Sequence, residues 1–286
     1  MQIEVLPTNA GLGAEVRGID MRKPLSSGEL EAFRAAWHRH VVLLVRDCPM
    51  NDEQLIAFSR QFGELQLSPS TEVTEKFGEF GTVAPEITVV SNIVEQGKPI
   101  GTLGSGEAFW HTDSSFIDTP AAYSILHGIE LPPTGGNTEF ADMYKAYDSL
   151  PEALKKRIEG LKAIHSFTHT SSGALRKGYE EITDVSRTPG AHHPLVRVHP
   201  ETGRKALFLG RRLNSYVIGL PVEESETLLD QLWSYATRPD LTWSHTWRPA
   251  DTVMWDNRCA MHRRDAFDAS QRRLLHRTQT KGTPTS

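Results

Sequence analysis

The sequence predicts a β-rich α+β fold in which a few helices support an antiparallel double sheet. Many short apolar and β-branched runs are separated by turns that contain Gly and Pro, which is typical of sandwiches and barrels. Helical periodicity is confined to a few segments. With 286 residues and 38% hydrophobic content, one such domain can bury a substantial core. We therefore expect a single domain over 1–286, although strand counting alone supports only a mixed β-rich domain.

The N-terminal part is expected to combine short strands with two helices. Phe33 and Trp37 lie at helical spacing, and Ser26 or Ser27 precedes them as a cap. Asn51 precedes a second apolar stripe and predicts another capped helix. The predicted elements are strands at 2–7, 41–45 and 87–93, and helices at 27–39 and from Asn51 to Gly63.

Two segments without periodicity flank the predicted strand at 87–93. Residues 66–86 and 95–109 are rich in Gly, Ser, Pro and Glu. Long loops in a compact chain are usually lids or poorly ordered insertions. We expect these two to cover a bound substrate, and a passive surface insertion is the alternative.

The rest of the chain is expected to supply most of the sheet. A helical stretch at 143–158 and an amphipathic helix at 223–235 interrupt the strands, and residues 170–190 form another loop. The predicted strands are 121–131, a strand from Thr138, 161–167, a pair at 193–199 and 206–209, 241–247, 252–255 and 273–280.

Composition limits the classes of partner. The net charge of −5 and the interspersed signs give no basic stripe, which argues against nucleic acid and favours a small molecule. Two cysteines are too few for a disulfide scaffold and fit a reduced, cytoplasmic protein. The chain starts without a signal-peptide pattern and has no apolar run of membrane-spanning length, so we expect neither export nor a membrane partner. The sequence is compatible with a homo-oligomer.

The stretch Trp110–Phe116 contains a candidate metal site. His111 and Asp113 are two positions apart and would face the same side of an extended strand. His262, which follows an apolar stretch, is a candidate third ligand. Two imidazoles and one carboxylate are the ligand set of non-haem ferrous oxygenases. The alternative is a solvated strand pair, because a His-x-Asp triplet is common by chance.

Together, these residues resemble the TauD/TfdA family of iron(II)- and 2-oxoglutarate-dependent dioxygenases. The resemblance covers nearly the whole chain and is nearer to the 2,4-dichlorophenoxyacetate dioxygenase branch than to the taurine branch. The motifs that carry it are His111-Thr112-Asp113, Trp255-Asp256-Asn257-Arg258 before His262, Arg273 and Arg277, Phe62-Gly63-Glu64-Leu65, Gly135-Gly136-Asn137-Thr138 and His193–Pro200.

The resemblance implies a double-stranded β-helix, a cupin-like jelly roll, as the core of one catalytic domain. It implies that Fe(II) bound by His111, Asp113 and His262 uses O2 and 2-oxoglutarate to hydroxylate a C–H bond, with release of succinate and CO2. If the attacked carbon bears an ether oxygen, hydroxylation would lead to C–O cleavage. Related halogenases lack the carboxylate, so Asp113 favours hydroxylation.

The resemblance also implies roles for residues around the metal. Arg273 and Thr138 would bind the far carboxylate of 2-oxoglutarate, because a buried charge needs a paired partner and a guanidinium offers two donors. Arg277 would meet an anionic group of the substrate. Ser68 stands where taurine-cleaving members place a His, which makes taurine a poor guess. Arg211 and Arg212 follow at a place where the family lines the substrate pocket, and either could recognise a carboxylate or be a solvated charge.

The expected substrate is therefore a small organic anion, such as an aryloxyalkanoate or another carboxylate. Alkyl sulfates and sulfonates are the alternative within the family. Outside it, a non-catalytic metal-binding β-sandwich and a metalloenzyme without a cosubstrate stay open. The two arginines after His262 speak against both, because a metal sensor needs no pair of anion-binding groups.

Overall fold

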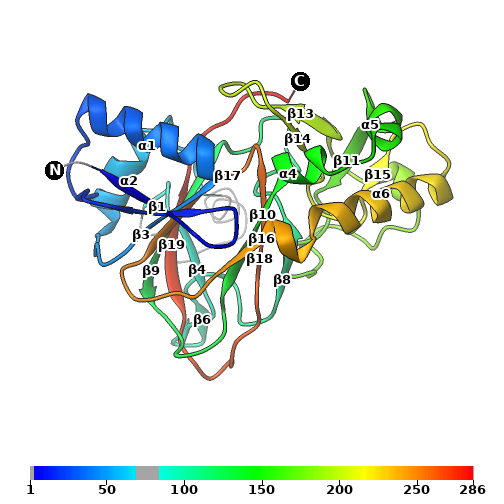
Figure 1. Cartoon of the computed structure of the whole chain (residues 1–286). Helices are drawn as coiled ribbons and strands as arrows, with labels where there is room; N and C mark the ends of the chain where they lie inside the picture. Colours follow the sequence, from blue (N-terminus) through cyan, green and yellow to red (C-terminus); the bar gives the residue numbers. More distant parts are fainter. Residues whose placement is uncertain (1–2, 69–83, 286) are drawn as a thin grey trace.

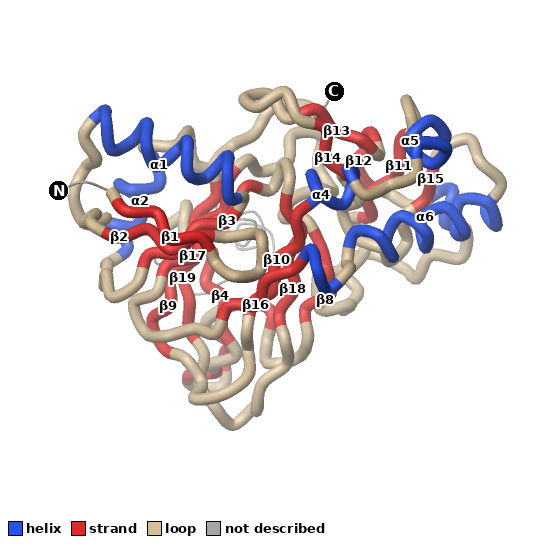
Figure 2. The backbone as a smooth tube through the Cα atoms, in the orientation of Figure 1, coloured by secondary structure: helices blue, strands red, loops and turns tan. Residues whose placement is uncertain are grey.

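The computed structural model describes residues 3–68 and 84–285 and has a β-rich α+β architecture (Figures 1 and 2). The larger sheet has eight strands. In spatial order they are β1 (Glu4–Pro7), β2 (Ala14–Arg17), β3 (Val42–Val45), β17 (Thr252–Asp256), β9 (Tyr123–Glu130), β19 (Leu274–Gln279), β4 (Thr88–Ser91) and β7 (Thr102–Leu103). The coarse fold class predicted from the sequence is confirmed.

The second sheet has four antiparallel strands. In spatial order they are β16 (Thr242–His245), β10 (Thr138–Asp142), β18 (Ala260–Arg264) and β8 (Ala108–His111). The sequence predicted no strand at β18 or at β2. Both strands are short, and charged side chains mask their apolar alternation.

Smaller elements surround the two sheets. Helices α1 and α2 lie on one side of the molecule, and α4, α5 and α6 lie on the other (Figure 1). The bounds of these elements are α1 (Ser27–His40), α2 (Asp52–Arg60), α4 (Met143–Asp148), α5 (Glu152–Ile158), α6 (Val222–Ala236), η1 (Val185–Arg187), η2 (Pro239–Leu241), β5 (Val94–Glu95), β6 (Lys98–Pro99), β11 (Lys162–Ser166), β12 (Gly190–Pro194), β13 (Val196–Val198), β14 (Lys205–Leu207) and β15 (Tyr216–Val217).

Both N-terminal helices begin with the predicted caps. Ser26 and Asn51 each form a capping box with the side chain three residues later, which satisfies free backbone donors of the first turn. Phe33 and Trp37 of α1 are fully buried and pack edge-on, with ring centroids 5.9 Å apart. These aromatic residues form a core between the helices and the large sheet.

The large sheet is buried on both faces. Along β17, Met254 joins the core under α1 and α2, whereas Val253 and Trp255 join the core shared with Phe140 of β10. Alternate side chains of a strand point to opposite faces, so this alternation places the small sheet and the N-terminal helices on opposite sides of the large sheet. The cavity described below lies between the two sheets.

Two predicted elements are interrupted. The helix expected over 143–158 is two helices, because the chain turns at Ser149–Leu150 and Pro151 caps α5. The strand expected over 193–199 divides at Leu195 into β12, which pairs with β11, and β13, which pairs with β14.

The two predicted loops differ in outcome. Most of 66–86 lies outside the described residues, so its expected role as a cover is not addressed. Residues 95–109 contain parts of the β5–β6 hairpin, β7 and the start of β8. β7 pairs with β4, so this segment extends the large sheet. Within the described ranges, no helix is long and apolar enough to cross a lipid bilayer.

Candidate metal centre and its cavity

Two neighbouring strands bring the three predicted metal ligands together. His111 is the last residue of β8 and is paired with His262 of β18 across the small sheet. Asp113 lies two residues beyond the end of β8, just before Ser114, whose φ of 53° turns the chain. The expectation that both residues of the His-x-Asp triplet lie on one strand is therefore wrong. They converge because the chain turns after β8.

The three side chains have the geometry of a metal site. Their ligand atoms all lie within 4.8 Å of one another. Asp113 Oδ1 is 3.7 Å from His111 Nε2 and 3.8 Å from His262 Nε2, and all three residues are buried. Both distances are too long for hydrogen bonds, so the imidazoles and the carboxylate are not paired with one another.

Neighbouring groups fix the orientation of each ligand. His111 Nδ1 lies 2.7 Å from the Phe109 carbonyl oxygen, which must accept its proton and so leaves Nε2 unprotonated. The His262 ring packs against Trp255, with centroids 4.6 Å apart. Asp113 Oδ1 accepts from Arg277 Nη1 at 2.8 Å.

Electrostatics favour the metal-binding protonation states. Burial lowers the pKa of His262 to about 4, and burial together with the neighbouring imidazole lowers the pKa of His111 well below its ordinary value. Burial opposes ionisation of Asp113, yet the Arg277 guanidinium and the two imidazoles hold the pKa of Asp113 below its ordinary value. At neutral pH the site therefore offers two neutral imidazoles and a carboxylate. This donor set fits Fe(II).

A polar network behind Asp113 was not predicted from the sequence. Ser124 Oγ donates to Asp113 Oδ2 at 2.8 Å and accepts from Asn257 Nδ2 at 2.8 Å and from Gln279 Nε2 at 3.0 Å. Trp255 Nε1 in turn donates to Asn257 Oδ1 at 2.9 Å. The Trp-Asp-Asn-Arg motif was the only signal of this network, and it does not reveal Ser124.

A cavity of about 280 Å³ opens from the three ligands between the sheets. Arg273 lines it and is 1% exposed. Its Nη2 donates to the Gly136 carbonyl, whereas its Nε and Nη1 have no hydrogen-bond partner among residues 3–68 and 84–285. Burial lowers the pKa of Arg273 to about 9, so the group is still charged at neutral pH.

The turn before β10 shapes this end of the cavity. Gly136 has a φ of 65°, and a Cβ there would lie 3.1 Å from Arg273 Nε. Thr138 lines the cavity and accepts from Trp247 Nε1 at 3.0 Å. A buried guanidinium with two unused donors beside a hydroxyl fits the far carboxylate of 2-oxoglutarate.

The other predicted substrate residues fall into two groups. Arg277 and Arg211 line the cavity. Arg212 does not, because its guanidinium pairs with Glu226 and Asp230 of α6 at 2.6 and 2.7 Å. Ser68 is buried, and its hydroxyl lies 2.9 Å from that of Thr88, which does line the cavity.

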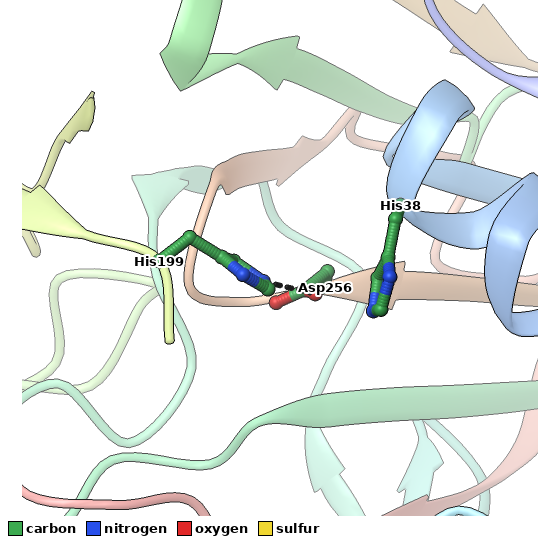
Figure 3. Close-up of side chains that lie close together, drawn as sticks. All are labelled: His38, His199 and Asp256. Carbon is green, nitrogen blue, oxygen red and sulfur yellow. Dashed lines mark hydrogen bonds and ion pairs between the residues drawn. The ribbon is translucent and has the colours of Figure 1, made fainter. Parts of the chain in front are cut away.

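A second histidine and carboxylate cluster, drawn in Figure 3, is made of residues that do not line the cavity. His38, His199 and Asp256 also place possible ligand atoms within 4.8 Å of one another. However, both oxygens of Asp256 already accept from the Arg258 guanidinium, at 2.8 and 2.6 Å. His199 Nδ1 accepts the backbone N–H of Glu201, so its Nε2 carries the proton that is donated to Asp256. His38 Nε2 lies 3.0 Å from the Tyr123 hydroxyl and 3.3 Å from Glu201 Oε2, so this cluster is a network of ion pairs and hydrogen bonds among the described residues.

The chain is similar to known dioxygenases over nearly its whole length. The model of the "Taurine catabolism dioxygenase TauD, TfdA family" matches residues 2–279. The chain is 36% identical to an alpha-ketoglutarate-dependent 2,4-dichlorophenoxyacetate dioxygenase of Cupriavidus pinatubonensis, covering 98% of each chain. It is 34% identical to an (S)-phenoxypropionate/alpha-ketoglutarate-dioxygenase of Sphingobium herbicidovorans, covering 99% of this chain and 96% of the relative. A crystal structure of AAD-2 in complex with Mn(II) and N-oxalylglycine matches with a TM-score of 0.81 and 35% identity, covering all of both chains.

Proposed function

The chain belongs to the TauD/TfdA family and is an iron(II)- and 2-oxoglutarate-dependent dioxygenase, and from this premise we propose that it hydroxylates a small organic carboxylate. These comparisons confirm the predicted family and the predicted enzyme activity. They also confirm the prediction of Fe(II) as the metal, 2-oxoglutarate as the cosubstrate and O2 as the oxidant. The observation that carries the proposed site is the convergence of His111, Asp113 and His262 beside the unpaired guanidinium of Arg273 in one cavity.

We assign the metal to His111, Asp113 and His262. Iron bound there supplies oxygen activation, in which 2-oxoglutarate becomes succinate and CO2 and a substrate C–H bond is hydroxylated. The two imidazoles would be held by paired strands of the small sheet, and the carboxylate by the turn that follows β8. Because the cavity lies between two sheets, it also limits the access of water to the reacting carbon.

Arg273 and Thr138 are proposed to bind the far carboxylate of 2-oxoglutarate. Arg273 Nε and Nη1 have no partner in the described part of the chain, and pairing them with a carboxylate would remove the cost of a buried charge with unsatisfied donors. Arg277 has a different role in this proposal. It donates to Asp113, so it orients the carboxylate ligand and still lines the substrate side of the cavity.

Aryloxyalkanoates are the first substrate candidates, because the relatives described above act on such compounds. The arginines that line the cavity favour an anion. Alkyl sulfates and sulfonates are the alternative, since a guanidinium pairs with either oxyanion. We also propose that the two sheets form the double-stranded β-helix of one domain, supported by α1 and α2 on the large sheet. We further propose that the protein is cytoplasmic, forms a homo-oligomer and does not bind nucleic acid.

Turnover assays test the proposed function. Purified protein with Fe(II), 2-oxoglutarate and O2 should form succinate faster when an aryloxyalkanoate or another carboxylate is added, and the organic product should carry one more oxygen or be cleaved. A preference for alkyl sulfates or sulfonates would favour the alternative. The same assay with His111→Ala, Asp113→Ala and His262→Ala should give no succinate, and turnover like that of the unmodified protein in any of the three contradicts the metal assignment.

A further inference from the structure

We infer that Arg176 and Arg211 form a binding subsite for the oxyanion of the primary substrate, separate from the 2-oxoglutarate subsite at Arg273. The ligand class is a carboxylate or a sulfate ester with an apolar body. This inference rests on the proposed function, because it says where the anion of that substrate binds. Arg176 lies in a loop without periodicity, and no sequence motif points to it.

The two guanidinium groups lie side by side in the cavity. Arg176 Nε and Arg211 Nη1 both donate to the carbonyl oxygen of His169. Both residues line the cavity that contains the metal ligands. Two cations that share one acceptor oxygen repel each other, and Arg176 contributes to lowering the pKa of Arg211 to about 10, after burial. A bound oxyanion would relieve this repulsion.

Aromatic rings hold Arg176 in place. Its guanidinium carbon lies 4.8 Å from the centre of the Phe116 ring and 4.6 Å from that of the Phe167 ring, which is cation–π distance. The Phe116 ring also lines the cavity. The same surface that fixes the cation therefore offers an apolar contact for the body of the substrate.

A tight hairpin in the loop between β11 and β12 positions Arg176. His169 and Leu175 form a β-bridge, and the Arg176 backbone N–H donates to the Thr168 carbonyl at 2.8 Å. The loop is thus ordered by its own backbone hydrogen bonds in the segment that carries Arg176. A fixed guanidinium loses little side-chain entropy when an anion binds.

The pair has unused hydrogen-bonding capacity. Within residues 3–68 and 84–285, no carboxylate forms an ion pair with either guanidinium. The adjacent Arg212, in contrast, pairs with two carboxylates. Among the described residues, Arg211 Nε is buried without an acceptor. The guanidinium of Arg211 makes one hydrogen bond there, from Nη1 to the His169 carbonyl oxygen. Arg277, in contrast, is already paired with Asp113.

The subsite lies next to the metal ligands. Arg211 forms a β-bridge with His111, and the Thr112 N–H donates to the carbonyl of Gly210 at 3.0 Å. An oxyanion bound at Arg211 would hold the nearby carbons of the same molecule beside the metal. Arg273 has different neighbours, the Gly136 turn and Phe267. Two separate cationic groups match two anions, a keto diacid and a substrate.

Anaerobic binding measurements test the subsite. Protein loaded with Fe(II) and 2-oxoglutarate is titrated with 2,4-dichlorophenoxyacetate, 2-phenoxypropionate and hexyl sulfate, and with the matched neutral alcohols. Binding is followed by calorimetry and by the change in the metal-to-cosubstrate absorption band. At least one anion should bind, and its neutral analogue should bind about ten-fold more weakly or worse, because a charge-assisted hydrogen bond is lost. The tightest anion identifies the oxyanion as carboxylate or sulfate.

Variants separate this subsite from the 2-oxoglutarate subsite. Arg176→Gln should weaken binding of the anion by about ten-fold or more while the affinity for 2-oxoglutarate changes by less than about two-fold. Arg211→Gln should have the same effect on the anion. Arg212→Gln is the matched control, because its guanidinium pairs with α6 outside the cavity, and it should bind like the unmodified protein.

The inference is overturned if no anion binds, if the neutral analogues bind as tightly, or if Arg176→Gln binds the anion like the control. Arg176 is half-buried in a loop, so this variant decides the question even where Arg211→Gln does not fold. The absorption band keeps the two proposals apart. Its absence in unmodified protein contradicts the assigned metal and 2-oxoglutarate sites, whereas its presence without anion binding contradicts only the subsite.

Discussion

Arg273 carries a charge deep in the molecule, and no carboxylate of the described residues forms an ion pair with it. Such a group is expensive to bury, and proteins keep it where a ligand supplies the missing partner. Here the Gly135-Gly136 turn leaves room for the side chain, because any Cβ at Gly136 would crowd Arg273 Nε. The residue-level prediction from the sequence named Arg273 and Thr138, and the structure places both on the same cavity wall.

Removing the Arg273 charge should affect the cosubstrate selectively. Arg273→Gln should raise the KM for 2-oxoglutarate about ten-fold to a hundred-fold, because hydrogen bonds to a charged group contribute about 1.5–3 kcal/mol. The neighbouring Arg272→Gln is the control, since Arg272 is exposed and pairs with Glu130. Steady-state succinate assays at varied 2-oxoglutarate measure both. Equal KM values for the two variants would argue against the assignment.

Ser124 illustrates a functional residue that the sequence does not reveal. In the sequence, a serine in a buried strand that supports a metal ligand cannot be told from one that only fills space. The structure shows that its hydroxyl joins Asp113 to Asn257 and Gln279. Such supporting hydrogen bonds hold a ligand in its binding orientation.

Loss of this hydroxyl should weaken metal binding. In Ser124→Ala, Asp113 loses a donor and two amides lose their acceptor, so the affinity for Fe(II) should fall about ten-fold or more. Titration of Fe(II) in the presence of 2-oxoglutarate measures the change. Ser234→Ala on the exposed face of α6 should have no effect. Unchanged affinity in Ser124→Ala would show that Asp113 is held by its other contacts alone.

At the level of elements, the sequence was most informative where local chemistry decides the structure. Ser26 and Asn51 mark the starts of α1 and α2, because the cap depends on residues within one turn. It was least informative at β18, whose Arg263 and Arg264 hide a strand that pairing with β10 and β8 stabilises. Pairing between distant segments leaves little trace in a single sequence. The loop that carries Arg176 has no periodicity, so its position in the cavity could not be predicted from the sequence either.

The central strand β9 contains a buried histidine that should make stability depend on pH. His127 Nε2 accepts the Met50 N–H at 3.3 Å, and its Nδ1 lies 2.8 Å from Thr252 Oγ1. Burial is the main cause that lowers the pKa of His127 from 6.5 to about 4. Between these values the unfolded chain binds a proton that the folded chain does not. The free energy of unfolding therefore falls as the pH decreases through this window.

For this one residue the loss should reach about 2 kcal/mol at pH 5 relative to pH 8. Denaturant unfolding of metal-free protein at several pH values measures it. Other buried histidines contribute to the same trend, so His127→Gln serves as the comparison, and its pH slope should be smaller. Identical slopes in the two proteins would show that His127 is protonated equally in the folded and unfolded states.

At the scale of the whole molecule, function depends on residues that the two sheets bring together. β8 and β18 of the small sheet supply the imidazoles, whereas Arg277 of β19 and Ser124 of β9 reach Asp113 from the large sheet. The metal triad could be proposed from the sequence because the His-x-Asp triplet occurs together with the Trp-Asp-Asn-Arg segment before His262. Its surroundings could not, since they arise only when the sheets pack face to face.

One anaerobic spectrum tests the central claim most directly. Fe(II) and 2-oxoglutarate added to the unmodified protein without oxygen should produce a visible metal-to-cosubstrate charge-transfer band, because both would bind in the same cavity. His262→Ala should give no band under the same conditions. A band of full intensity in His262→Ala, or none in unmodified protein that has bound iron, would contradict the assigned site.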